Sequence, residues 1–141
     1  MITHNLQLVQ SALKKAGAGL DAGARGARDE MAMVLTQLAK EEIAGKRGKT
    51  GGVWDKATSG QPPMNRTGNL RRSIRAEKKT EGFAKYSALV GPTIVYGRAV
   101  ELGGAPTWEP GTKFPYMAPA FAKFRVVAPF IIRKHLAIGG K

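Results

Sequence analysis

Apolar residues in the first forty positions recur at intervals of three or four, which places them on one face of an α-helix. The members of this stripe are Leu6, Val9, Leu13, Ala16, Leu20, Ala24, Ala27, Met31, Val34 and Leu38. Four glycines between positions 17 and 26 each cost about 1 kcal/mol in a helix interior, but the stripe keeps its phase through them. We predict one helix, bent or loosened near residues 17–26 and ending at Gly45. Its length of roughly 60 Å exceeds what a small domain covers, so part of the stripe is expected to meet another chain.

The middle of the chain changes from loop-like to strand-like patterning. Residues 45–66 are rich in Gly, Lys and Pro without periodicity, which predicts a flexible loop. Apolar and polar residues then alternate over Ser73–Lys79 and again over Phe83–Gly91. This alternation predicts an antiparallel hairpin with its turn at Glu81 and Gly82. Residues 95–102 are expected to form a short helix.

The last third predicts a second flexible loop, over residues 103–113, followed by a short strand containing Phe114 and Tyr116. A C-terminal helix is expected to begin at Pro119 and to be kinked by Pro129. Its apolar stripe comprises Met117, Phe121, Phe124, Ala128, Ile131 and Leu136. The sequence thus predicts one α+β domain over residues 1–141, with a long N-terminal helix, a small antiparallel sheet and a C-terminal amphipathic helix.

Charge is concentrated in the middle of the chain. The net charge is +13, and residues 45–85 carry eleven basic and three acidic groups. A basic cluster lies here, formed by Arg66, Arg71, Arg72, Arg75, Lys78 and Lys79. We favour a solvated face, or a surface that forms salt bridges with an acidic neighbour, over phosphate contact. Few aromatic residues are interleaved with the charges, which disfavours binding of RNA or single strands. Sequence-independent DNA binding is the alternative function.

Residues that carry catalytic chemistry are scarce. The chain has no Cys, and His4 and His135 lie near opposite ends. The acidic pairs at positions 29–30 and 41–42 are adjacent on a helix, so their carboxylates diverge by about 100°. No phosphate-binding loop or nucleophile elbow is present. We therefore expect no enzyme activity and no catalytic, cofactor or metal residues. The longest apolar run, Val126–Ile132, is too short to span a membrane.

Three stretches, in order, resemble a phage protein family. They are Thr67–Ile74 (TGNLRRSI), Val95–Gly103 (VYGRAVELG) and Pro115–Phe121 (PYMAPAF). They are similar to the T-G-x-L-R-x-S-I, Y-A-x-x-V-E-x-G and P-F-L-x-P-A-L signatures of a minor tail-component family. That family, the gene-product-ten-like group of lambdoid phages, comprises neck or tail-completion proteins of long-tailed phages. This chain departs from the signature at Gly97, where Ala is usual.

The resemblance implies a virion protein made in the host cytoplasm that forms a ring, of six copies, between head and tail. The ring would join the head connector or stopper to the tail terminator or tail tube. Completion, terminator and stopper roles all stay open. Candidate subunit and partner contacts are Trp54, Arg66, Arg71, Arg72, Glu101, Trp108, Tyr116 and Met117. Candidate contacts to an acidic surface or to the packaged DNA end are Arg71, Arg72, Arg75, Lys78 and Lys79.

Overall fold

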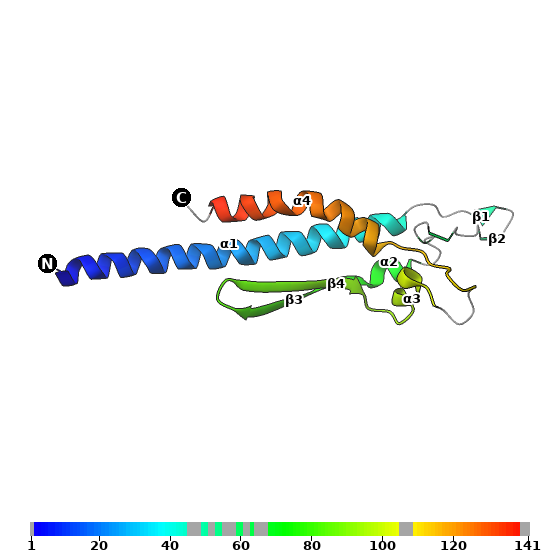
Figure 1. Ribbon diagram of the computed structural model, residues 1–141, viewed down its shortest axis with the longest axis horizontal. Helices are drawn as coiled ribbons and strands as arrows, with labels where there is room; N and C mark the ends of the chain where they lie inside the picture. The colour runs from blue at the N-terminus through cyan, green and yellow to red at the C-terminus, as the bar shows by residue number, and fades with distance from the viewer. Residues whose placement is uncertain are drawn as a thin grey trace.

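The computed structural model describes residues 2–44, 49–50, 53–54, 59–60, 63, 68–104 and 109–138. The elements are α1 Ile2–Ala44, β1 Lys49–Thr50, β2 Val53–Trp54, α2 Asn69–Ser73, β3 Ile74–Gly82, β4 Lys85–Pro92, α3 Gly97–Leu102 and α4 Met117–Ile138. The predicted α+β class is therefore confirmed. Helix α1 forms the long axis of the molecule, with α4 along one side and the β3–β4 hairpin along the other (Figure 1).

Helix α1 runs for 43 residues, about 65 Å, without interruption in the glycine segment. The glycines are positions where other elements approach closely. A Cβ atom at Gly17 would lie 3.3 Å from the Phe83 ring, and one at Gly23 would lie 2.8 Å from the backbone oxygen of His135. At Gly26 it would lie 2.6 Å from the His135 imidazole. The absence of side chains thus lets α4 and the hairpin pack against the helix. The predicted end at Gly45 lies outside the described residues.

The β3–β4 hairpin has antiparallel register from Ile74 opposite Pro92 to Gly82 opposite Lys85, with an irregularity between Thr80 and Gly82. The turn lies at residues 83–84, so the predicted turn at Glu81 and Gly82 is wrong by two residues. Ala84 adopts a φ of 52°, and its backbone N–H donates to Asp21 of α1 at 2.9 Å. A contact 63 residues away in sequence therefore fixes the turn.

Two other segments differ from the sequence pattern. The predicted loop 45–66 contains an antiparallel strand pair, β1 and β2, of two residues each. The predicted strand at Phe114 and Tyr116 is absent from the described residues around it. The Phe114 N–H instead donates to the Val100 oxygen at 2.8 Å. Tyr116 directly precedes α4, which begins at Met117, two residues before the predicted start.

The core lies where α1, α3, α4 and the start of β3 meet. It consists of Ala39, Ile43, Ile74, Val100, Tyr116 and Ala120. Helix α4 buries Ala120 and Ile131 against this layer, whereas Phe121 and Leu136 of the predicted stripe are 50% and 44% exposed. The predicted face is therefore confirmed at Met117, Phe124, Ala128 and Ile131, which are buried or half-buried, and wrong at Phe121 and Leu136. Helix α4 continues through Pro129, and its first turns run at an angle to the rest (Figure 1).

Candidate functional site

The second and third sequence motifs meet at the start of α4. Glu101, in the last turn of α3, accepts backbone hydrogen bonds from three consecutive residues of the α4 N-terminus. The N–H groups of Tyr116, Met117 and Ala118 donate to its carboxylate at 2.6, 2.9 and 2.9 Å. These donors have no partner within the helix, and the negative charge favours the positive end of the helix dipole. Glu101 therefore joins α3 to α4 within one protomer.

Tyr116 is fully buried beneath this junction. Its hydroxyl donates to the Gly97 oxygen at 3.1 Å, across 19 residues of sequence. Burial, together with the Glu101 carboxylate, raises the pKa of the Tyr116 phenol well above its ordinary value. The structure thus places this predicted contact residue in the core, where it holds the two motifs together. Met117 is half-buried beside it.

Replacing Glu101 with Gln is expected to lower the free energy of unfolding by about 1–2 kcal/mol, since a helix cap and its charge are weakened together. Urea unfolding followed by circular dichroism measures the change. Glu109→Gln is the matched control, because Glu109 is exposed in the preceding loop. An equal shift in both variants would contradict a capping role for Glu101.

The basic cluster is divided between elements and faces. Arg71 and Arg72 belong to α2, and the Arg72 guanidinium donates to the Asn69 side chain at 2.7 Å. On β3, Lys78 faces α1 and pairs with Asp29 at 3.3 Å, whereas Lys79 alternates onto the other face. Lys79 pairs with Glu77 at 3.9 Å. Arg72, Lys78 and Lys79 of the cluster are thus engaged within the chain.

Three of the predicted contact residues cannot be placed in this arrangement. Arg66 and Trp108 lie outside the described residues. Trp54 belongs to strand β2, where only the backbone is described, opposite Lys49.

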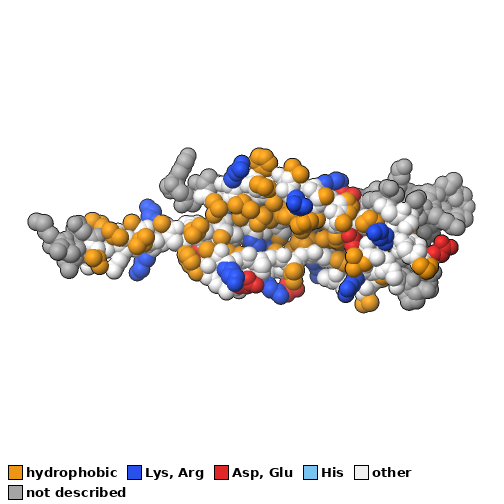
Figure 2. Space-filling model, viewed as in Figure 1, with side chains coloured by type: hydrophobic (Ala, Val, Ile, Leu, Met, Phe, Trp, Pro, Cys, Tyr) orange, Lys and Arg blue, Asp and Glu red, His pale blue; other side chains and the backbone are white. Residues whose placement is uncertain are grey.

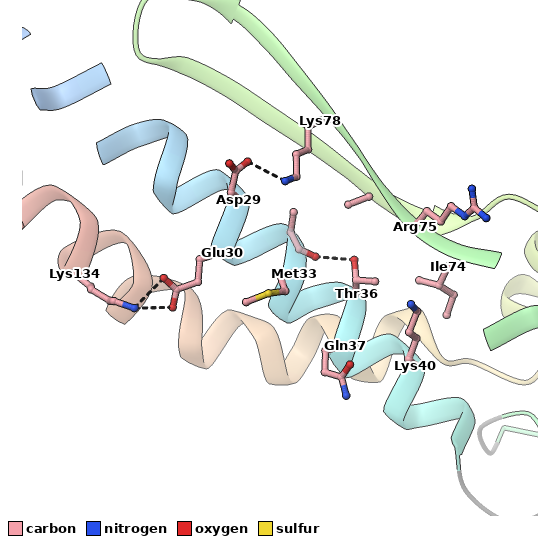
Figure 3. Close-up of a pocket in the computed structure, with 12 residues that line it drawn as sticks. Asp29, Glu30, Met33, Thr36, Gln37, Lys40, Ile74, Arg75, Lys78 and Lys134 are labelled. Atoms are coloured by element: carbon pink, nitrogen blue, oxygen red, sulfur yellow. Dashed lines mark hydrogen bonds and ion pairs between the residues drawn. The ribbon is translucent and has the colours of Figure 1, made fainter. Parts of the chain in front are cut away.

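A groove of about 950 Å³ lies on α1 between the hairpin and α4 (Figure 3). Met33, which is 66% exposed, is on its floor, and Lys40, Arg75 and Lys134 are among the basic side chains that line it. Lys134 pairs with Glu30 at 3.0 Å. Lys40 and Arg75 form no ion pair with another described residue, so the groove carries positive charge beside an apolar floor.

Glu30 connects α1 to the last turns of α4. Its carboxylate lies 2.6 Å from the His135 imidazole and 3.0 Å from the Lys134 ammonium. These contacts with His135 and Lys134 hold the pKa of Glu30 below its ordinary value. Lys123 pairs with Glu42 near the other end of α4. Glu30 and Glu42 of α1 therefore both hold α4 in place.

Large apolar side chains are exposed on two surfaces. The N-terminal apolar stripe consists of Leu6, Val9, Leu13 and Leu20, which are 48–66% exposed. Helix α4 exposes Phe121, Val126, Phe130 and Ile132 to 40–69%, on different sides of the helix. Figure 2 shows hydrophobic side chains along the projecting part of α1 and gathered over the middle of the molecule. The stripe on α1 lies on one helix face, and an exposed apolar surface of this kind is typical of sites of association.

The described residues contain neither a group of metal ligands nor a membrane-spanning helix. No three His, Cys, Asp or Glu side chains among them are grouped so that they could hold a metal ion. Within the same ranges, no helix has the length and apolar character needed to cross a bilayer.

No protein-family profile, curated protein or solved structure matches this chain. The resemblance to the tail-component family therefore depends on the three sequence motifs alone. The second and third motifs contact each other through Glu101 and Tyr116.

Proposed function

We propose that this chain is a structural subunit of the neck of a long-tailed phage, where copies form a ring that joins the head to the tail. The observation that carries the proposal is the apolar surface that one copy leaves uncovered on α1 and α4. The three tail-component motifs supply the biological context, and they imply six copies. The function is adhesion between proteins.

The exposed area supports association. The accessible surface of the chain is 10031 Å², whereas a compact monomer of 15.1 kDa exposes about 7,100 Å². A subunit in a ring contacts two neighbours, and a standard interface buries about 800 Å² on each partner. Two such interfaces fit within the excess surface. An elongated subunit with this excess of accessible surface is typical of a protein that buries part of its surface against neighbouring subunits.

The charges favour protein partners over DNA. Lys78, Lys79 and Lys134 are paired with acidic groups of the same chain. Lys40 and Arg75 remain available beside the exposed Met33 in the groove. An exposed apolar side chain beside two cations that form no ion pair with another described residue suits an amphipathic acidic segment of a neighbouring ring protein. The proposed role for the groove is therefore docking of the head connector or of the tail.

The mass of the purified chain in solution tests the proposal. We expect a ring, alone or on addition of the head-connector and tail-tube proteins of the same phage. Light scattering coupled to size exclusion gives the mass, and electron microscopy shows ring closure. A protein that stays at 15.1 kDa with and without those partners would overturn the proposal.

Titration with duplex DNA at several salt concentrations distinguishes sequence-independent DNA binding from the proposed role in the neck. A sequence-independent DNA-binding protein would bind the duplex tightly at low salt and lose affinity steeply as salt rises. The neck proposal predicts weak binding to DNA at physiological salt. Tight, salt-sensitive DNA binding by a monomer would favour the alternative.

A further inference from the structure

The β3–β4 hairpin is a sheet of two strands, so one edge of β3 is not paired with any strand of the described part of the chain. The backbone N–H and C=O groups along such an edge can pair with a strand of another chain. A two-stranded sheet also gains stability from a third strand. The outer edge of β3 is therefore a candidate surface for strand addition.

Antiparallel pairing determines which backbone groups lie on this outer edge. The Thr93 N–H donates to the Ser73 oxygen at 3.0 Å, so the odd-numbered residues in the first part of β3 direct their N–H and C=O groups toward β4. The N–H of Ile74 agrees with this alternation, because it bonds to α2 and not to β4. The N–H and C=O groups of Ala76 and Lys78 consequently lie on the outer edge.

The outer edge of β3 forms one side of the groove on α1 (Figure 3). The residues of β3 that line the groove are Ile74, Arg75, Ala76 and Lys78. They span about 13 Å, the length of a short strand. The floor is α1, where Met33 is 66% exposed. An extended segment in the groove would therefore meet backbone hydrogen-bonding groups on one side and an apolar side chain on the floor.

We propose that the groove binds an acidic, extended segment of a partner protein, which joins the sheet as a third strand beside β3. Four basic and two acidic side chains line the groove, which leaves a net charge of +2. Lys78 and Lys134 pair with acidic residues of α1. Lys40 and Arg75 form no ion pair with another described residue. Carboxylates on an added strand supply the complementary charge.

The charges of the hairpin disfavour a second copy of this chain as the occupant. Strand β3 carries three basic and two acidic residues, and β4 carries one basic residue and no acidic residue. Either strand of a second copy would bring further positive charge into a groove that is already positive, and like charges on neighbouring strands destabilise a sheet. The occupant is therefore a strand of a different protein.

The inference rests on the proposed function and specifies how a neck protein docks. In strand addition, main-chain hydrogen bonds supply the affinity, and side-chain contacts supply the specificity. The outer edge of β3 would hold the partner strand, and the cations of the groove would select an acidic partner.

A synthetic peptide of alternating glutamate and valine tests the groove independently of the neck proteins. We expect the full chain to bind this peptide and to bind a lysine–valine peptide at least about tenfold more weakly. Isothermal titration calorimetry at low salt compares the two affinities. Methylation of alternate backbone nitrogens of the acidic peptide is expected to abolish binding, because it removes the N–H donors that face β3.

Two substitutions test the charge and the strand edge separately. Lys40→Glu is expected to weaken binding of the acidic peptide at least about tenfold. Lys85→Glu is the matched control, since Lys85 is exposed on β4 and does not line the groove. Ala76→Pro removes an N–H from the outer edge and none that bonds to β4, so it is expected to abolish binding while the hairpin remains. Circular dichroism verifies that each variant folds.

Hydrogen exchange of single amides gives a readout in the unmodified chain. We expect the amides of Ala76 and Lys78 to exchange faster than those of Arg75 and Glu77, which bond to β4. The acidic peptide is expected to slow exchange at Ala76 and Lys78 at least about tenfold and to leave Arg75 and Glu77 unchanged.

Failure of strand addition and failure of the neck proposal give different results. Rings that form while the acidic peptide does not bind, or binds without protecting Ala76 and Lys78, overturn strand addition and leave the proposed function standing. Peptide binding that protects both amides in a chain that never assembles supports strand addition and overturns the neck proposal. Equal affinity for the two peptides, or unchanged affinity in Lys40→Glu, overturns the acidic partner. Protection of both amides in the concentrated chain alone assigns the edge to a second copy and overturns the inference.

Discussion

The Tyr116→Ala variant is expected to lose about 3–5 kcal/mol of unfolding free energy. Tyr116 is fully buried between α1, α3 and the start of α4, so the deletion leaves a cavity that rigid neighbours cannot fill. It also leaves the Gly97 carbonyl without the hydroxyl donor that now lies at 3.1 Å. A loss of this size is a large fraction of the stability of a small domain. Urea unfolding of the purified variant gives the value.

Two further variants separate the effect of the lost hydrogen bond from the effect of the cavity at Tyr116. Tyr116→Phe keeps the ring and removes only the hydrogen bond, so it is expected to cost about 1 kcal/mol. Tyr96→Ala removes the same side chain from a half-exposed position, and we expect a change below about 1 kcal/mol. Equal losses at Tyr96 and Tyr116, with an unchanged dependence on urea, would contradict the assigned core.

The elements that periodicity determines could be predicted from the sequence. The apolar stripe of α1 predicts one continuous helix despite the glycines, and the structure has it over Ile2–Ala44. Alternation predicts the hairpin, and Pro92 ends β4 as its missing N–H requires. These signals are local, since each residue's direction follows from its position in its own element.

What could not be predicted depends on distant residues. Asp21 fixes the hairpin turn by accepting from Ala84 and from the Tyr86 hydroxyl, at 2.9 and 2.7 Å. Glu101 caps a helix that starts 16 residues later. Gly23 lets α4 approach α1 closely, whereas helix propensity alone indicates only that glycine is unfavourable at this position of the helix. Each of these signals emerges only when the elements are placed against one another.

The candidate contact residues also divide into those that local sequence signals identify and those that depend on distant residues. The sequence identifies surplus apolar stripe on α1, and the exposure of Leu13 agrees with it. It does not reveal that Lys78 is paired with Asp29, because that pairing depends on how the hairpin lies on α1. Nor does it distinguish Tyr116, which is buried, from Phe121, which is half-exposed, although both belong to the third motif.

Replacing Gly97 with Ala, the residue that the family signature has at this position, is expected to destabilise this chain by about 1–3 kcal/mol. A Cβ atom at Gly97 would lie 2.5 Å from both Cβ and Cγ of Pro92 and 3.3 Å from the Tyr116 hydroxyl oxygen. The proline ring is rigid, so α3 or the end of β4 must move. The better helix propensity of Ala offsets at most about 1 kcal/mol of this cost. Urea unfolding measures the net change.

A double-mutant cycle assigns the cost to Pro92. Pro92→Gly removes the opposing ring, so Gly97→Ala should be nearly neutral in that background, and the difference between the two backgrounds is the interaction energy. Gly91→Ala is the matched control, because a Cβ atom there meets nothing within 4 Å. A Gly97→Ala variant as stable as the parent chain would refute the close packing of α3 on Pro92. A loss that disappears with Pro92→Gly would explain the departure from the signature physically: this chain has glycine at position 97 because proline occupies position 92.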